Sequence, residues 1–359
     1  MMATKTYLAG DLGGTKTLLC IYEEIDGQLR QAHANRYRSA DWHDLESMLR
    51  HFLDQTPDNL PTPVSGCIAV AGRVHQGRAE LTNLPWQMTE QSLSEVTGVK
   101  QLELVNDFAV LIHGLAHFSD QQQLVLQLGR DRSTPAAAGA DNGPVAILGA
   151  GTGLGMARGL PTAGGWLAIP SEGGHREFAP RSDAEWELAQ WLKQDLGLQR
   201  VSIERIVSGT GLGHVMNWLL NRRRDLGHSL RACAHAWRTI AADQPGYQDL
   251  PAITGKAAAA GDPLAAEAME LWLGAYGSAA GDLALQELCI GGLWIGGGTA
   301  QKNLDGLRSS QFLEPLRCKG RFRSLIESMT IRAVIDPEAG LFSAACRARD
   351  LAKPGGTLA

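Results

Sequence analysis

Short apolar runs divide the chain, and several of them stop at glycine-rich turns. Residues 7–12 and 18–22 are apolar and contain many branched and aromatic side chains, which predicts two strands joined by a turn. Asp26-Gly27 is a tight-turn sequence that leads into a third predicted strand, residues 28–38. We therefore expect the chain to begin with three strands connected by hairpin turns.

A helical period follows the third strand. Asp41 is expected to cap a helix whose apolar stripe includes Trp42, Leu45 and Leu49. Beyond this helix we predict a buried strand at 64–72, a helix at 89–96 ended by Gly98, a strand at 102–105 and a helix at 108–118. Strands and helices in this order predict an α/β unit with a mixed sheet.

The second half of the chain repeats the opening pattern. Residues 121–143 are expected to be a linker or an inserted loop. A strand at 145–148 then enters the turn 149–155 and the chain reverses, which suggests two related halves. Further on we predict a strand at 166–169, a helix from Ser182 to about 196, mostly helical chain over 211–288, strands at 293–295 and 331–335, and a final helix at 341–351.

The composition is that of a soluble globular protein, with 359 residues of which 44% are hydrophobic and 20% are charged. This length favours two domains. The net charge is −5 and both signs are interspersed, so no basic field points to a nucleic-acid or membrane partner. The six cysteines are scattered without a C-x-x-C pair, and no apolar leader or spanning segment is seen, which predicts a reducing cytoplasm.

The first turn contains residues that could bind an anion and a cation. Asp11 is followed by Gly13 and Gly14, whose backbone N–H groups could approach an anion without a Cβ in the way. An anion nest beside a carboxylate suits a nucleotide polyphosphate with its Mg²⁺ ion, whereas an ordinary hairpin turn is the simpler alternative. A Rossmann fingerprint is excluded because Leu154 stands where its third glycine would be, and a Walker loop because Lys256 precedes Ala257.

Three strands end at glycine turns, and short polar motifs lie between them: Gly10 to Thr15, Asn106-Asp107-Phe108, Gly149 to Gly155, Glu172-Gly173-Gly174-His175, Ser202 to Gly209 and Gly296-Gly297-Gly298. With these motifs nearly the whole chain resembles the bacterial glucokinases, within the superfamily of sugar kinases, actin and heat-shock chaperone ATPases. The resemblance implies a two-domain actin-like ATPase (ribonuclease H-like) fold, with mixed sheets flanked by helices and an active-site cleft. It implies a small α/β domain of residues 1–116 and 336–359, and a large one of residues 117–335.

The same resemblance assigns the candidate site residues. The phosphates and adenosine of ATP are expected at Gly10, Asp11, Gly13, Gly14, Thr15, Gly149, Gly151, Thr152, Gly153, Gly296, Gly297 and Gly298. The sugar is expected at Asn83, Asn106, Asp107, Glu172, His175 and Glu204. Asp107 would be the catalytic base, and Asp11 would hold Mg²⁺ through a water. A strand-end carboxylate can accept the proton of an alcohol, although Asp107 could instead cap a helix starting at Phe108.

The resemblance implies ATP-dependent phosphorylation of D-glucose on its 6-hydroxyl, by a homodimer. The charge pattern points to neither a nucleic-acid nor a membrane partner. A kinase for mannose or N-acetylmannosamine and a non-catalytic sugar sensor are the alternatives, and a sensor would need neither Asp11 nor Asp107. The stretch between Cys67 and Cys233 holds no cysteine, which excludes the zinc cluster of a sibling class of sugar kinases and repressors. His113 and His117 lack a third ligand nearby and are expected to be structural. Longer loops at 133–143 and 228–248 are departures from the family pattern.

Overall fold

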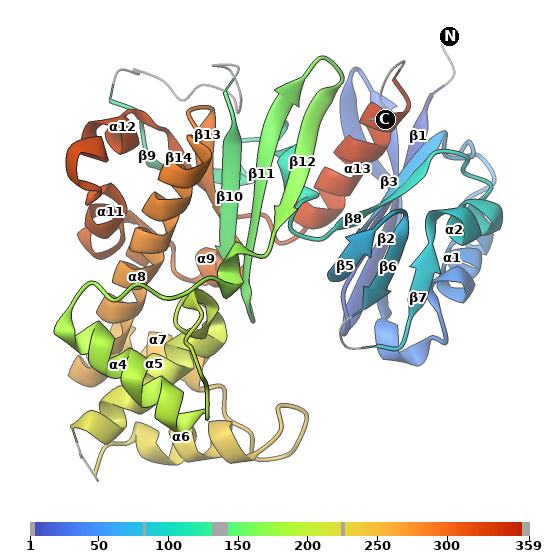
Figure 1. Cartoon of the computed structure of the whole chain (residues 1–359). Helices are drawn as coiled ribbons and strands as arrows, with labels where there is room; N and C mark the ends of the chain where they lie inside the picture. The colour runs from blue at the N-terminus through green and yellow to red at the C-terminus, as the bar shows by residue number, and fades with distance from the viewer. Residues whose placement is uncertain (1–3, 82–83, 131–142, 224–226, 354–359) are drawn as a thin grey trace.

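The computed structural model describes residues 4–81, 84–130, 143–223 and 227–353. Its strands form three sheets, and Figure 1 shows two lobes, each built around one of the two larger sheets. No described helix combines the length and the hydropathy that a transmembrane segment requires. All six cysteines are free, as their scattered positions predict.

The first sheet contains the predicted opening strands. Its order is β3-β2-β1-β4-β8. The strands are β1 (Thr6–Leu12), β2 (Lys16–Ile25), β3 (Gln28–Arg38), β4 (Ser65–Val70) and β8 (Leu102–Asn106). The first three are antiparallel neighbours, and β4 and β8 add in parallel to β1. Asp26 and Gly27 both have positive φ (53° and 75°), the backbone of a type I′ hairpin turn, which confirms the predicted turn.

Helices cover both faces of this sheet, because apolar side chains point alternately to its two faces along each strand. The helices are α1 (Leu45–Asp54), α2 (Glu90–Thr97) and α13 (Ala339–Leu351). Leu8 and Leu19 pack in the cluster that holds α1 and α2, whereas Tyr7 and Ala9 pack against α13. Asp11 follows Ala9 on the α13 face, so its carboxylate points toward the helix that ends the chain.

Three predictions for this lobe were wrong or incomplete. Asp44, not Asp41, caps α1 by accepting a hydrogen bond from the Ser47 amide, because Asp41 lies in a 3₁₀ turn of residues Ser39–Asp41. Residues 108–118 form turns around the short helix α3 (Leu111–Gly114) instead of one long helix. A small sheet of β5 (Gly72–His75), β6 (Arg78–Leu81) and β7 (Gln87–Thr89) was not predicted.

The second sheet has the order β12-β11-β10-β13-β14-β9. Its strands are β9 (Gln123–Gln127), β10 (Val145–Ala150), β11 (Leu154–Thr162), β12 (Gly165–Ser171), β13 (Gly292–Gly296) and β14 (Ile331–Val334). The predicted hairpin is confirmed, since β10 and β11 are antiparallel neighbours joined at residues 151–153. β10, β13 and β14 run parallel, so the second and third glycine turns leave the same edge of the sheet.

The helices of the second lobe share one large apolar cluster with this sheet. They are α4 (Asp183–Asp195), α5 (Gly209–Arg222), α6 (Leu230–Thr239), α7 (Leu250–Ala259), α8 (Pro263–Glu287), α9 (Gly298–Lys302), α10 (Leu304–Arg308), α11 (Ser310–Arg317) and α12 (Arg323–Ser328). Figure 1 shows α4, α5, α6 and α7 grouped below the strands. Ser182 caps α4, and the predicted helical content of residues 211–288 is confirmed.

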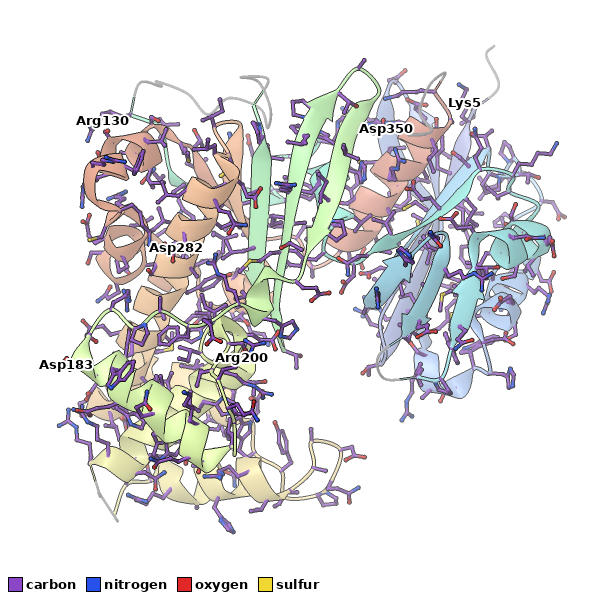
Figure 2. The ribbon with its side chains drawn as sticks, viewed as in Figure 1. Lys5, Arg130, Asp183, Arg200, Asp282 and Asp350 are labelled. Carbon is purple, nitrogen blue, oxygen red and sulfur yellow. The ribbon has the colours of Figure 1, made fainter. Side chains whose placement is uncertain are left out.

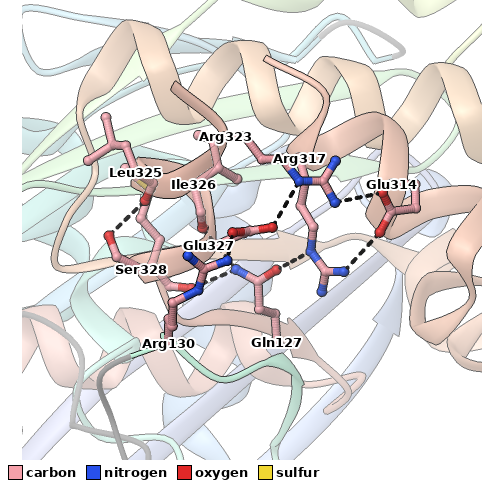
Figure 3. Close-up of polar contacts among 10 residues, drawn as sticks. Gln127, Arg130, Glu314, Arg317, Arg323, Leu325, Ile326, Glu327 and Ser328 are labelled. Atoms are coloured by element: carbon pink, nitrogen blue, oxygen red, sulfur yellow. Dashed lines mark hydrogen bonds and ion pairs between the residues drawn. The ribbon is translucent and has the colours of Figure 1, made fainter. Parts of the chain in front are cut away.

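The predicted linker 121–143 contains strand β9, which was missed. Figure 3 shows side-chain contacts that hold this strand. Gln127 Nε2 donates to the backbone carbonyls of Ile326 and Met329, both at 2.9 Å, and Gln127 Oε1 accepts from Arg317 Nε at 2.7 Å. These partners lie about two hundred residues away along the chain, so no local pattern could reveal them. Residues 131–142, most of the longer loop expected at 133–143, lie outside the described residues.

The layer between the two sheets consists of α13 and the 108–118 segment. Phe342 of α13 and Val105 of β8 each pack against both apolar clusters of this layer. The chain enters the second sheet after α3 and returns to the first after β14. The domain boundaries at residues 116 and 336 stay a prediction.

Gly277 lets α8 and α11 approach closely. A Cβ at this position would lie 2.0 Å from the Phe312 carbonyl oxygen, which belongs to the backbone and cannot turn away. Gly277→Ala should therefore lower the free energy of unfolding by at least ~1–3 kcal/mol, measured by urea denaturation. Gly255→Ala is the matched control, because a Cβ inside α7 meets nothing within 4 Å and should stabilise the helix slightly. Equal effects would contradict this account.

Candidate active site

The first glycine turn is braced by the 3₁₀ turn that follows β3. Gly13 N–H donates to the Lys16 carbonyl at 3.0 Å, which closes the turn between β1 and β2. Ser39 Oγ donates to the Gly13 carbonyl at 2.7 Å, and Ser39 N–H donates to the Thr15 carbonyl at 3.1 Å. Gly14 and Thr15 therefore form a loop tip whose shape is fixed from both sides. Ser39 was not predicted, because its role depends on pairing across the sheet.

Asp11 is half-buried immediately before this turn. Its carboxylate lies against the start of α13, where a Cβ on Gly340 would be 3.1 Å from Asp11 Oδ2. Burial raises the pKa of Asp11, the Glu338 charge raises it further, and the Lys16 charge opposes both. A cation beside this carboxylate would stabilise its ionised form.

Asn106 and Asp107 lie at the end of β8, and the Asp107 N–H donates to the Val70 carbonyl at 2.9 Å. Asn106 Oδ1 accepts from the amides of Phe108 and Ala109, both at 3.0 Å, so the capping of this turn is done by Asn106. The Asn106 side-chain amide also donates to Asp107 Oδ1 at 3.0 Å. Asn106 therefore holds the Asp107 carboxylate in one orientation.

Asp11 and Asp107 share one site. The pKa of Asp107 is raised to about 6, first by burial and then by the negative charge of Asp11, while hydrogen bonds from backbone amides and from Asn106 oppose the rise. Two carboxylates that repel each other in a half-buried site are expected where a protein binds a cation and transfers a proton. These two side chains, which come from distant parts of the sequence, therefore lie near each other.

The second glycine turn is held by the start of α5. Gly151 N–H donates to the Gly153 carbonyl at 2.9 Å, and Gly209 N–H donates to the Gly151 carbonyl at 2.8 Å. Thr210 Oγ1 donates to the Thr152 carbonyl at 3.1 Å. A Cβ on Gly151 would meet nothing within 4 Å, so open space lies beside this turn. Gly209 and Thr210 stand in a small polar run that could have indicated this role.

The third glycine turn packs on the second. Gly297 has φ of +83°, and a Cβ there would lie 2.6 Å from the Ala150 carbonyl oxygen. A Cβ on Gly298 would meet nothing within 4 Å. Gly10, by contrast, lies inside β1 beside Ile68 and Leu19. Gly151 and Gly298 of the predicted nucleotide set therefore have open space beside them.

Glu172, His175 and Glu204 form a second polar cluster. His175 Nε2 lies 3.7 Å from Glu172 Oε2, and His175 Nδ1 lies 4.0 Å from Glu204 Oε1. The Glu172 side chain is 89% exposed and that of Glu204 is 26% exposed. His175 and Glu204 border a pocket of about 560 Å³ with Leu198, Gln199, Arg200, Ser202 and Arg205. The predicted sugar residues from two separate loops are thus brought together.

Backbone pairing fixes the two loops of this cluster. Ile203 N–H donates to the Arg176 carbonyl at 2.9 Å, and Arg200, labelled in Figure 2, donates from Nη1 to the His175 carbonyl at 2.7 Å. Arg200 was not predicted. It carries no pattern of its own, because its partner is a backbone oxygen 25 residues away.

Glu204 joins the two halves of the site. Its Oε2 accepts a hydrogen bond from the Leu154 amide at 2.9 Å, and a Cβ on Gly153 would lie 2.5 Å from the same oxygen. One carboxylate therefore touches both the cluster around His175 and the second glycine turn. Asn83, the remaining predicted sugar residue, lies outside the described residues.

No three His, Cys, Asp or Glu side chains in the described part of the chain form a metal-binding group. His113 is buried, and burial with the nearby Arg347 charge lowers its pKa to about 3, so it is neutral in a packed interior. His113 therefore behaves as the structural residue that the sequence suggested.

Comparison with known proteins shows the family of this chain. The family model described as Glucokinase matches residues 8–351. The chain belongs to the glucokinase family. The glucokinase of Trichormus variabilis is 37% identical over 347 residues, which cover 95% of this chain and 98% of that protein.

Two solved glucokinase structures have a similar fold. The crystal structure of a glucokinase from an Antarctic psychrotroph superposes with a TM-score of 0.79 and 27% identity, over 96% of this chain and 99% of that one. A ROK family glucokinase from Streptomyces griseus, in complex with glucose and AMPPNP, has a TM-score of 0.57 and 19% identity, over 97% of this chain and 99% of that one. The predicted two-domain actin-like ATPase fold is confirmed.

The raised pKa of Asp107 makes the folded state bind a proton more tightly than the unfolded chain. Its stabilising contribution is complete below pH ~4 and is lost as pH rises through about 6. Asp107→Asn removes this titration, so its Tm relative to wild type should be higher at pH 7.5 than at pH 4.5 by ~1–4 °C. Differential scanning calorimetry measures this, with Asp120→Asn, at an exposed position, as control. A pH-independent difference would contradict the assignment.

Proposed function

We propose that this protein transfers the γ-phosphoryl group of ATP to the 6-hydroxyl of D-glucose, giving glucose 6-phosphate and ADP. The observation that carries the proposal is the shared site of Asp11 and Asp107 beside the glycine turns. Membership of the glucokinase family supports both substrates. The ROK family glucokinase of the same fold, seen with glucose and AMPPNP, supports the nucleotide.

Asp107 acts as the base in this proposal. Phosphoryl transfer depends mostly on positioning and charge stabilisation, so the acceptor hydroxyl needs one fixed acceptor rather than a strong base. With a pKa of about 6 the carboxylate is ionised at neutral pH and can take the hydroxyl proton. Asn106 keeps Asp107 Oδ1 in place through the hydrogen bond at 3.0 Å.

Mg²⁺ suits the charge around Asp11. The half-buried carboxylate faces the negative charges of Glu338 and Asp107, which the Lys16 charge opposes, so a divalent cation would relieve repulsion. Asp11 would hold the ion, through a water, and phosphate oxygens of the nucleotide would supply further ligands. When bound, the ion neutralises charge on the transferred phosphate.

Glu172, His175, Glu204 and Asn106 would bind the sugar hydroxyls, with Asn83 as a further candidate. Carboxylates and an imidazole offer fixed acceptors and a donor to a ring of hydroxyl groups. A hydroxyl of the wrong configuration would leave a buried acceptor unpaired, which disfavours epimers.

The turns formed by Gly13, Gly14, Thr15, Gly151, Thr152, Gly153 and Gly298 would bind ATP. The Gly13 and Gly151 N–H groups close their turns, so phosphate contacts would come from other N–H groups of these turns. A homodimeric state and a cytoplasmic location stay predictions, the latter supported by six unpaired thiols.

The decisive experiment is an ADP-release assay across glucose, mannose, N-acetylmannosamine and other hexoses, with polyphosphate as an alternative donor. Glucose with ATP should give the highest kcat/KM. Turnover with another sugar alone would replace glucose as the substrate. Sugar binding without any turnover would identify a sensor and overturn the proposal.

Asp107→Asn should lower kcat by at least ~10²-fold while glucose still binds, because the amide keeps the shape of the carboxylate but cannot accept the proton. Steady-state kinetics and calorimetric titration with glucose measure the two effects separately. Asp120→Asn is the control and should leave both unchanged. Near-normal turnover of Asp107→Asn would reject the base.

The pH dependence follows from the same carboxylate. Below pH about 6 Asp107 takes up a proton and can no longer act as base, so kcat/KM should fall tenfold per pH unit on the acid side and level off above it. A rate profile between pH 4.5 and 8 measures this limb. A midpoint near pH ~4, the ordinary range of an aspartate, would show that Asp107 is not the group that titrates.

A further inference from the structure

The side chain that follows Asp107 reaches across to the second sheet. Phe108 is half-buried, and its ring lies against two glycines of the β10–β11 hairpin. A Cβ on Gly155 would be 2.6 Å from Phe108 Cγ and Cδ2, and a Cβ on Gly149 would be 2.7 Å from Cζ. These distances are too short for any side chain, so the ring occupies the space that side chains would fill.

Three glycines lie in one row beneath this ring. Gly149 of β10 is paired in register with Gly155 of β11 on one side and with Gly296 of β13 on the other. A Cβ on Gly296 would lie 3.7 Å from Phe108 Cζ. The row therefore forms a flat glycine seat across three neighbouring strands, at the edge where the second and third glycine turns begin.

The ring is also anchored on its other side. Phe108 packs against the apolar cluster that contains Ala109, Ile112, Val145 and Ile147, which joins the 108–118 segment to the second sheet. Its own backbone amide donates to Asn106 Oδ1. The residue next to the proposed base is thus fixed at once to the end of β8 and to the strands that carry the glycine turns.

We propose that Phe108 is a positioning residue, which sets the distance between the Asp107 carboxylate and the nucleotide turns by resting its ring on Gly149, Gly155 and Gly296. The inference rests on the proposed function, because it assumes that Asp107 is the base and that these turns bind ATP. Gly149 and Gly296 are then needed mainly as a seat for the ring, with Gly151 and Gly298 left open for the ligand. In-line transfer is sensitive to a displacement of about 1 Å, which can cost ~10²-fold in rate.

The test is a double-mutant cycle between Phe108 and Gly155. Gly155 is suited to it because the three atoms nearest to its added Cβ all belong to Phe108, whereas Gly149 would also strike Gly296. Phe108→Ala should lower kcat by ~10–10²-fold with changes in KM for glucose and ATP below about threefold. Gly155→Ala should lower kcat in wild type and have no further effect in the Phe108→Ala background.

Gly306→Ala is the control within the second lobe. Its Cβ would lie 2.9 Å from Leu273 Cδ1, a side-chain clash in a different apolar cluster from that of Phe108, so its effects on kcat and on the free energy of unfolding should be independent of Phe108→Ala. Calorimetry confirms that each variant is folded at the assay temperature.

Each outcome separates the two proposals. An inactive wild-type protein would overturn the proposed function. An active wild type with a folded Phe108→Ala variant that keeps kcat within threefold would overturn the positioning role alone. Independent effects of Phe108→Ala and Gly155→Ala would overturn it as well, because the ring would then not be the partner of the glycine seat.

Discussion

Close approach of backbone and side chains at the tip of the β10–β11 hairpin is the contact on which the site depends. Glu204 hydrogen-bonds to the Leu154 amide, Gly209 to the Gly151 carbonyl, and Gly297 packs on Ala150. Phe108 reaches the same hairpin from the first lobe. A Cβ on Gly153, Gly155 or Gly297 would lie 2.5–2.6 Å from another heavy atom, so glycine here serves packing as much as ligand approach. One hairpin thereby relates the proposed base, the sugar cluster and the nucleotide turns.

Charge arrangement is the second constraint. Asp11 and Asp107 lie at the ends of different strands of the first sheet. Burial raises the pKa of both carboxyl groups, and the Asp11 charge raises that of Asp107 further. These unfavourable charges occur within an otherwise well-packed lobe, because a site that binds a cation and transfers a proton needs ionisable groups with no fixed ion-pair partner. Asn106 limits the cost by donating to Asp107 Oδ1 and by capping the following turn. Residues 106–108 therefore combine the proposed base with the hydrogen bonds that stabilise it and the following turn.

Much of the fold could be predicted because its signals are local. Strands ending at glycine, the Asp26-Gly27 turn and the Ser182 cap each depend on a few neighbouring residues, and each is confirmed. The errors share one cause. β9 needs partners on α12 and β14, and the 108–118 segment gives up helix for turns where it is packed between α13 and the second sheet. Such contacts override a helical or loop-like composition.

The sequence by itself determined the glycine turns, the carboxylates that stand beside them and the resemblance to a kinase family, because residue type and spacing suffice for these. Tertiary structure alone decided that Asp11 and Asp107 meet, that Glu204 reaches the second turn, and that a row of glycines supports Phe108. Each of these depends on the register between strands and on the packing of two lobes, which bring together residues distant along the chain. Local sequence patterns do not indicate which distant residues will come together.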